Sequence, residues 1–172
     1  NQFNEQDLKL ISKINDVGRS MIIVINKLDL FKGDEKKVLE RLSTIAPYLN
    51  SYPIVFLSAL EAKGIKKLFD QIYRVQQNSV KDIKTNKLND YLREALSKQP
   101  LPYKSSFRPK IRFIHQGGKN PHIMMMHGNS LNKIDESYKR YLINFLSKKL
   151  NLMGVNIKLK FLNTKNPFNK KK

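Results

Sequence analysis

Residues 21–29 read Met21-Ile-Ile-Val-Ile-Asn-Lys-Leu-Asp29, an apolar run followed by a polar loop. An uninterrupted apolar run of this length is typical of a strand buried on both faces of a parallel sheet. The polar residues Asn26, Lys27 and Asp29 then follow the carboxyl end of the strand, where open α/β sheets bind their ligands. The stretch therefore predicts an α/β fold with a ligand-binding loop at residues 26–29.

The residue types of this loop suit guanine. One carboxylate, that of Asp29, can accept the N1–H and N2–H donors of guanine as a charge-assisted bidentate pair. Adenine has an acceptor at N1, so the same carboxylate rejects it. The aliphatic stem of Lys27 can lie along the purine face, and the Asn26 amide can brace the loop. Taken alone, Asn-Lys-x-Asp also fits an ordinary polar turn after a strand.

A second element strengthens the guanine interpretation. Residues 53–57 are another apolar run, and Ser58-Ala59-Leu60 follows it directly. A helix predicted over residues 35–49 connects the two strands, so the crossover should be right-handed and both loops should share one sheet edge. A backbone N–H near Ala59 can then donate to guanine O6. The combination predicts the base-reading part of a nucleotide site.

Periodicity predicts three helices in the first half of the chain. One starts at Asn4-Glu-Gln-Asp7 and ends at Gly18, and another runs from Gly64 through residue 75. The helix over 35–49 should turn Val38, Leu39, Leu42 and Ile45 inward. Residues 1–80 are predicted to be a first domain that carries the guanine-recognition loops, residues 81–85 a linker, and residues 86–172 a second domain.

The second domain is predicted to be a small α+β unit in the order helix, strand, strand, helix, strand. The helix covers residues 88–96, the strands are 110–115, 123–127 and 156–161, and Asp135 caps the second helix. A turn is expected at Gly117-Gly118 and an extended loop at residues 99–109. Alternation should turn Ile111 and Phe113 toward the helices, and the methionines at 124–126 should belong to the sheet core.

The chain has 172 residues and a net charge of +19, and the excess lies in the second half. Residues 1–80 hold 12 Lys+Arg against 9 Asp+Glu, whereas residues 81–172 hold 21 against 5. Such a field favours a polyanion such as RNA or DNA, although AT-biased coding would also enrich lysine. The candidate nucleic-acid contacts are Lys110, Arg112, Lys158 and Lys160 on one sheet face, with Lys139 and Arg140 on the second helix.

Several other classes of protein are disfavoured. The chain has no cysteine, and its three histidines, His115, His122 and His127, lack helical metal-ligand spacing. No apolar run reaches membrane-spanning length and no signal peptide opens the chain, so a cytoplasmic protein without a membrane partner is expected. Asn1 is not a methionine and the first residues look helical, which fits a chain that begins inside a domain.

The chain resembles the carboxyl-terminal part of the Der (EngA) family of bacterial tandem GTPases over essentially all of its residues. The Asn26-Lys27-x-Asp29 and Ser58-Ala59-Leu60 loops match the second GTPase domain of that family, and the resemblance implies that residues 1–80 are the carboxyl-terminal part of that GTPase domain. The motifs that match its terminal KH-like domain are His115-Gln-Gly-Gly-Lys-Asn-Pro121, His127-Gly-Asn129, Ser137-Tyr-Lys-Arg-Tyr-Leu142, Met153-Gly154 and Asn166-Pro-Phe168. The resemblance implies GTP-dependent assembly of the large ribosomal subunit, with a KH-like domain that contacts ribosomal RNA and the GTPase domains.

This sequence departs from the family pattern in its phosphate chemistry. It has no Gly-x-x-x-x-Gly-Lys-Ser/Thr loop, no switch threonine and no Asp-x-x-Gly segment. Only the guanine part of GTP or GDP is expected to be bound here, by residues 26, 27, 29 and 58–60, while the Mg²⁺ of the intact protein would lack ligands. No catalytic residue is predicted. The alternative is a non-catalytic RNA- or ribosome-binding module that uses a basic surface, because no Gly-x-x-Gly clamp is present.

Overall fold

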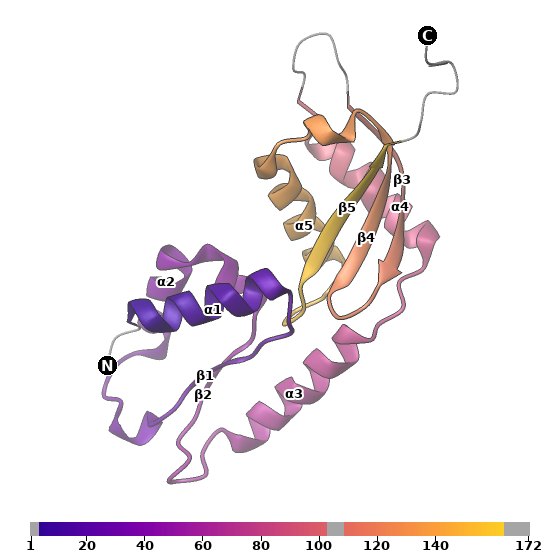
Figure 1. The fold of residues 1–172 in the computed structure, drawn as a ribbon. Helices are drawn as coiled ribbons and strands as arrows, with labels where there is room; N and C mark the ends of the chain where they lie inside the picture. Colours follow the sequence, from indigo (N-terminus) through magenta and orange to yellow (C-terminus); the bar gives the residue numbers. More distant parts are fainter. Residues whose placement is uncertain (1–3, 103–108, 164–172) are drawn as a thin grey trace, which may run out of the picture. The chain divides into compact units, whose positions relative to one another are not determined.

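The computed structural model describes residues 4–102 and 109–163, which form two compact units (Figure 1). The first unit runs to Lys81 and also includes Asn151–Asn156. The second unit takes Asp82–Leu150 and the chain from Ile157 onward. The chain therefore enters the second unit, returns to the first for six residues, and goes back to complete the second sheet.

Within its described residues, the first unit holds two short strands, three α-helices and two 3-10 turns. In chain order they are α1 (Glu5–Val17), β1 (Ile23–Ile25), η1 (Leu28–Leu30), α2 (Glu35–Ile45), η2 (Pro47–Ser51), β2 (Ile54–Phe56) and α3 (Ile65–Ser79). The predicted helix over 35–49 is thus divided. Its α-helical part ends at Ile45, and Pro47, which cannot donate to the helix, begins a 3-10 turn instead.

The termini predicted for α1 are confirmed. The Asn4 side chain accepts the backbone N–H of Asp7 at 2.8 Å, and the Asp7 side chain accepts that of Asn4 at 3.1 Å. This reciprocal capping box satisfies two backbone donors that the first turn of a helix leaves unpaired. Gly18 ends the helix in the left-handed conformation, at φ 85°, which glycine adopts without steric cost.

Strands β1 and β2 pair in parallel, with Ile23 opposite Ile54 and Ile25 opposite Phe56. Apolar side chains from α1, α2 and the turn after α2 pack on this pair, and Ile11, Met21, Leu42 and Leu49 are all buried. The prediction that Leu39 and Ile45 point inward is wrong, since these side chains are 38% and 50% exposed. Amphipathic spacing had identified the apolar positions of α2, but only part of that stripe is buried.

The returning segment Asn151–Asn156 is bonded into the first unit. The Met21 N–H donates to the Gly154 carbonyl at 3.0 Å, and the Gly154 N–H donates to the Ser51 carbonyl at 2.8 Å. The Tyr52 hydroxyl lies 2.8 Å from the Asn15 amide oxygen and also bonds the Asn156 side chain. The sequence division at residues 81–85 did not anticipate this exchange of chain between the units.

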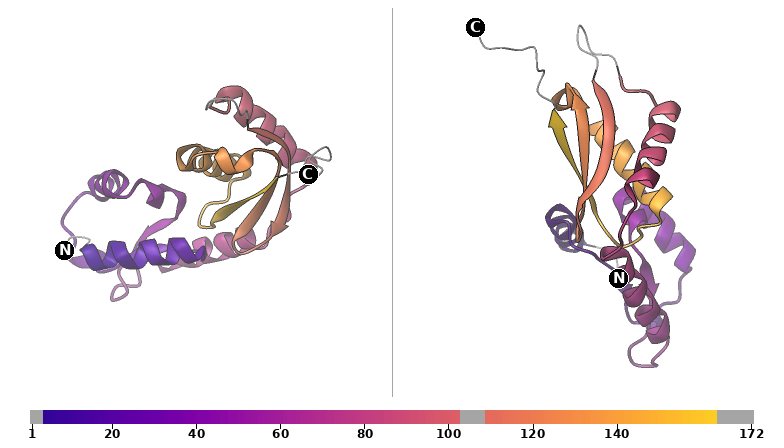
Figure 2. Two further views of the ribbon diagram at one scale, coloured as in Figure 1. Left: turned by 45° about the horizontal axis from the view of Figure 1, so that its top comes forward. Right: turned by 90° about the vertical axis from the view of Figure 1, so that its right-hand side faces the viewer.

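The second unit has the predicted order of elements. They are α4 (Thr85–Lys98), β3 (Lys110–Gly118), β4 (His122–Asn129), the 3-10 turn η3 (Leu131–Lys133), α5 (Glu136–Leu150) and β5 (Ile157–Asn163). The strand order is β3-β4-β5, with β3 antiparallel and β5 parallel to β4. Figures 1 and 2 show α4 and α5 on the same side of this sheet. The Asp135 carboxylate accepts the Tyr138 N–H at 2.9 Å, so the predicted cap of α5 is confirmed.

A bulge in β3 changes which side chains face the helices. Ile111 pairs with Gly128 but Phe113 pairs with His127, so Arg112 is an extra residue between them. An extra residue reverses the alternation beyond it. Ile111 and Ile114 are buried while Phe113 is 42% exposed, and the prediction that Ile111 and Phe113 share the helix-facing side is wrong.

The predictions for β4 and for the turn before it are partly confirmed. Met124 and Met126 are fully buried in β4, as expected of sheet core, whereas the side chain of Met125 is on the other face and partly exposed. The turn between β3 and β4 lies at residues 119–121 and not at Gly117-Gly118, which continue β3. Of the predicted loop over 99–109, residues 103–108 lie outside the described part, as do Asn166-Pro-Phe168.

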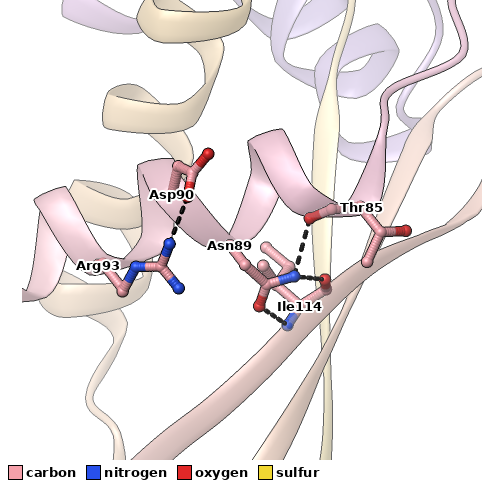
Figure 3. A network of polar contacts seen from close by, with 5 residues as sticks. All are labelled: Thr85, Asn89, Asp90, Arg93 and Ile114. Carbon is pink, nitrogen blue, oxygen red and sulfur yellow. Dashed lines mark hydrogen bonds and ion pairs between the residues drawn. The ribbon is translucent and has the colours of Figure 1, made fainter.

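An asparagine on α4 closes the free edge of β3 (Figure 3). The Asn89 amide nitrogen donates to the Ile114 carbonyl at 2.9 Å, and its oxygen accepts the Ile114 N–H at 3.1 Å. The same nitrogen donates to the Thr85 carbonyl at 2.8 Å. The side chain thereby imitates a neighbouring strand at an edge that would otherwise expose its backbone groups. Among the described residues, no helix is long and apolar enough to cross a membrane.

Candidate functional site

The loops after β1 and β2 are held side by side by backbone hydrogen bonds. The Leu57 N–H donates to the Ile25 carbonyl at 2.9 Å, and the Leu28 N–H donates to the Leu57 carbonyl at 3.0 Å. These bonds extend the parallel pairing of the two strands into the loops. Residues 26–29 and residues 58–60, which are far apart in sequence, therefore lie at one edge of the pair.

Ser58 and Asp29 join the two loops through their side chains. Ser58 is fully buried, and its Oγ donates to Oδ1 of Asp29 at 2.5 Å. The same Oγ accepts the Glu61 N–H at 3.2 Å. This contact orients one carboxylate oxygen, while Asp29 itself lies at the surface. A carboxylate held in this way is suited to accept paired N–H donors from a planar ligand.

Asn26 braces the loops from the other side. Its Oδ1 accepts the backbone N–H of Lys27 at 2.7 Å and that of Ala59 at 3.1 Å. Lys27 adopts the left-handed conformation with φ 65°, which is uncommon for a residue other than glycine. The Ala59 N–H that was expected to face guanine O6 is thus donated to Asn26 in this structure. Leu60 projects into solvent and is 87% exposed.

The turn that follows Ser58 is fixed by its neighbours. The Ser58 N–H donates to the Lys63 carbonyl at 3.0 Å, and Gly64 adopts φ 78° before α3 begins. A side chain at Gly64 would bring its Cβ within 2.5 Å of the Phe56 carbonyl oxygen, so only glycine fits. Lys63 forms an ion pair with Glu61 at 2.7 Å. The hydrogen bond to Glu61 and the charge of that carboxylate raise the pKa of Lys63, and the charge of Asp29 makes a smaller contribution.

The six predicted nucleic-acid contacts do not form one surface. Pairing and exposure put Lys110, Lys158 and Lys160 on the sheet face opposite the helices. Arg112 is exposed in the bulge. Lys139 is different, because it bonds Glu136 at 2.6 Å and lies over the ring of Phe161, 5.6 Å from its centroid, on the helix side. Arg140 is exposed on α5.

Three rings on the open sheet face were not among the predicted site residues. Phe113, His115 and His127 come together there, with the two imidazoles stacked 5.0 Å apart. The only sequence signal was the alternation around the histidines, and the bulge hid Phe113 from it. His122, in contrast, is fully buried on the helix side, where its Nδ1 lies 2.8 Å from the Gln116 amide nitrogen.

The described residues offer no cluster of three or more His, Cys, Asp or Glu side chains that could hold a metal ion. The loops bring together one carboxylate, one amide and one hydroxyl, from Asp29, Asn26 and Ser58.

The sequence of the chain matches one protein-family model and several known proteins. Residues 83–161 match the family model described as the KH-domain-like, carboxyl-terminal domain of EngA bacterial GTPases. The chain is 36% identical over 169 residues to GTPase Der of Legionella pneumophila (strain Corby), and 35% identical over 166 residues to GTPase Der of Thioalkalivibrio sulfidiphilus. These alignments cover 98% and 96% of the chain.

The chain spans about 37% of the length of the first relative and 36% of the second. The two units described above are consistent with these matches, because the KH-like match falls on α4 through β5 and the longer alignments also include the loops at residues 26–29 and 58–60. The chain belongs to the Der (EngA) family of bacterial GTPases, and it carries the family's KH-like domain at residues 83–161.

Proposed function

We propose that residues 26–29 and 58–60 read the guanine base of GTP or GDP in a GTP-hydrolysing protein that acts in assembly of the large ribosomal subunit. In this proposal Asp29 accepts N1–H and N2–H of guanine, and Lys27 lies along the base. The observation that carries it is the hydrogen bond from Ser58 to Asp29, which joins the two loops over 2.5 Å.

Asn26 would have a double role in base recognition. Its side-chain oxygen accepts the Ala59 N–H in this structure. Guanine O6 can share that N–H as a second acceptor, because three-centre hydrogen bonds are common in proteins. Leu60, which is exposed beside it, would then cover one edge of the bound base.

The chain itself is proposed to bind base without hydrolysing nucleotide. Phosphoryl transfer depends on groups that position the phosphates and Mg²⁺, and the sequence lacks the motifs that supply them. The intact cytoplasmic protein would be the GTPase. Purified chain should therefore release no phosphate from GTP, and Mg²⁺-dependent turnover that Asp29→Ala abolishes would contradict this.

The base preference of the intact protein tests the proposal. Xanthine has an acceptor where guanine has its N2–H donors, so Asp29→Asn should move the preference from GDP to XDP. Competition against a fluorescent guanine nucleotide measures the shift. Asp70→Asn, which makes the same change at an exposed site on α3, serves as the control. Unchanged base preference in the Asp29 variant would refute this role of the loop.

The second unit is proposed to contact ribosomal RNA, and the GTPase domains of the intact chain are its other expected partners. The support is its charge, since residues 81–172 hold 21 Lys+Arg against 5 Asp+Glu. A non-catalytic RNA-binding module remains a second candidate because the chain lacks phosphate-binding motifs. When lysine and arginine side chains neutralise RNA phosphates, the counterions of those phosphates are released. The affinity for RNA should therefore fall steeply as the salt concentration rises, in either case. A flat salt response would refute the RNA partner.

A further inference from the structure

We propose that the open face of the β3-β4-β5 sheet is a stacking platform for unpaired bases of RNA. The platform is formed by the rings of Phe113, His115 and His127, with Lys158 and Lys160 beside them. The inference rests on the proposed RNA partner and adds the surface that binds it and the kind of RNA that fits.

The three rings form one cluster. Phe113 lies 5.7 Å from His115 and 5.8 Å from His127, measured between ring centroids. The imidazoles are stacked at 24° and joined by a hydrogen bond of 3.2 Å between His127 Nε2 and His115 Nδ1. Aromatic faces fixed in this way can receive a base with little loss of side-chain entropy.

The cluster is not part of the core. Phe113 is 42% exposed, and both imidazoles are partly exposed. Rings that belong to the core of the same unit, such as Tyr138 on α5 at 2% exposure, lie on the opposite side of the sheet. The bulge at Arg112 is what turns Phe113 outward, since regular alternation would have put it beside Ile111 on the helix side.

Strand pairing extends the surface to β5. His127 pairs with Leu162, and Met125 pairs with Lys160, so exposed side chains of β5 share the face of the rings. Gly117 makes room on this face, because a Cβ there would lie 2.4 Å from Cγ of Met125. The result is a sheet surface that carries rings on β3 and β4 and lysines on β5.

Charge complementarity indicates a polyanion as the occupant. None of the three strands contains an aspartate or glutamate. The acidic residues of the second unit all lie outside these strands, and they are Asp82, Asp90, Glu94, Asp135 and Glu136. The positive field over the sheet face is therefore not opposed by carboxylates of its own strands.

Single-stranded RNA fits this surface better than a duplex. The bases of A-form RNA are stacked on one another and its major groove is too deep and narrow for side chains to read. An unpaired base exposes its π-face, and aromatic side chains on a sheet bind it by stacking, while nearby lysines contact the backbone phosphates.

Anisotropy titrations with the whole chain test the proposal. The probes are a short labelled single strand of mixed sequence and a duplex of the same length. Phe113→Ala and His127→Ala should each weaken single-strand binding by roughly 5- to 100-fold, the range expected for one lost base stack. Duplex affinity should stay nearly unchanged, and Phe113→Tyr should retain single-strand affinity because it keeps the ring.

Two further variants separate stacking from charge. Lys160→Gln should weaken single strand and duplex alike and lower the salt slope by about 0.7 for the single strand. Phe69→Ala removes an exposed ring on α3 in the first unit and should change neither affinity. Thermal melting of each variant, followed by circular dichroism, ensures that only folded protein is compared.

The outcomes are distinguishable. If the ring variants bind single strand as well as the wild type while Lys160→Gln weakens it, the platform is refuted and the RNA partner stands. If the wild-type chain binds neither RNA at moderate salt, the RNA partner fails and the platform with it. If an acidic polypeptide competes as well as RNA and loses affinity equally in the ring variants, the face is a protein-docking surface and the proposal is overturned.

Discussion

Ser58 donates a hydrogen bond to Asp29 across 2.5 Å, although 29 residues separate them in the chain. The serine is fully buried and the aspartate is at the surface, so a rigid group orients an exposed one. The proposed guanine specificity depends on the Asp29 oxygens staying coplanar with the two N–H groups of the base. This contact is consequently the most direct place to perturb recognition without removing the carboxylate.

Ser58→Ala should weaken guanine-nucleotide binding by the intact protein about tenfold, in proportion to one lost hydrogen bond to a charged group. It should also destabilise the first unit by about 0.5–1.5 kcal/mol, the net contribution of the hydrogen bond that the Glu61 N–H donates to Ser58. Calorimetric titration and chemical unfolding measure the two effects. Ser43→Ala, which removes an exposed hydroxyl on α2, is the matched control, and equal behaviour of both variants would contradict the role given to Ser58.

Gly154 should be as sensitive as a core residue, even though it lies in a connecting segment. Its φ is 83°, and a Cβ there would meet Cγ2 of Val75 at 2.3 Å. Gly154→Ala should therefore destabilise the chain by about 2 kcal/mol or more, which combines backbone strain with overpacking. Gly33→Ala is the comparison, because there the nearest atoms belong to one movable side chain, that of Phe31. Similar melting temperatures for the two variants would contradict the argument.

The elements that local patterns can specify were predicted well. Apolar runs identified β1 and β2, and short polar residues marked the caps of α1 and α5, because these signals lie within a few neighbouring residues. The bulge at Arg112 is one extra residue whose pairing depends on β4, so alternation alone could not reveal it. The ring cluster was missed for the same reason.

Two features were harder to predict: which apolar side chains of α2 are buried, and the return of residues 151–156 to the first unit. Spacing shows which side of α2 is apolar, but the exposure of Ile45 depends on whether another element covers it. The bonds of Gly154 to Met21 and Ser51 join residues more than 100 positions apart, and no local pattern carries that information. The loops at residues 26–29 and 58–60 were predicted to meet because a right-handed crossover leaves little choice.

Hydrogen exchange should differ between the two units. The first unit holds two strands of three residues each, and apolar side chains such as Phe69, Ile72 and Tyr73 on α3 are exposed. A two-stranded sheet is marginal, so amides of β1 and β2 should exchange much faster than those of β4, which has partners on both sides. Uniformly slow exchange in both units would contradict this prediction.

Alkaline stability should reflect two buried tyrosines. Burial raises the pKa of Tyr52 to about 12 and that of Tyr138 to about 12, while an unfolded tyrosine has a pKa of about 10. The folded state therefore holds these protons more tightly. Their contribution to stability is complete below about pH 10 and is lost as the pH rises toward about 12.

Ultraviolet absorbance of tyrosinate during an alkaline titration measures this effect. A late-titrating set should be present in the wild type, and Tyr52→Phe should reduce it and remove part of the stability loss above about pH 10. Tyr48→Phe removes a more exposed hydroxyl and should leave the late set intact. A single transition for all tyrosines near their ordinary pKa would contradict the burial of these hydroxyls.

Asn89 provides the sharpest test of how the β3 edge is protected (Figure 3). Its amide serves both backbone groups of Ile114, so Asn89→Ala leaves an N–H and a carbonyl unpaired and should cost about 1–3 kcal/mol. Asn89→Asp has the same shape but no N–H donor, and its carboxylate faces the carbonyls of Thr85 and Ile114. The aspartate variant should thus be less stable than the alanine variant above the carboxyl pKa and should recover when it is protonated.

Asp90→Ala is the control for the same helix. It removes only the surface pair with Arg93, and exposed pairs contribute less than about 1 kcal/mol. Chemical unfolding at two pH values compares the three variants, and light scattering follows edge-to-edge association, which should rise in the Asn89 variants because an unprotected strand edge can pair with another chain. If the Asn89 variants unfold and scatter like Asp90→Ala, α4 protects β3 by apolar packing alone and the amide is dispensable.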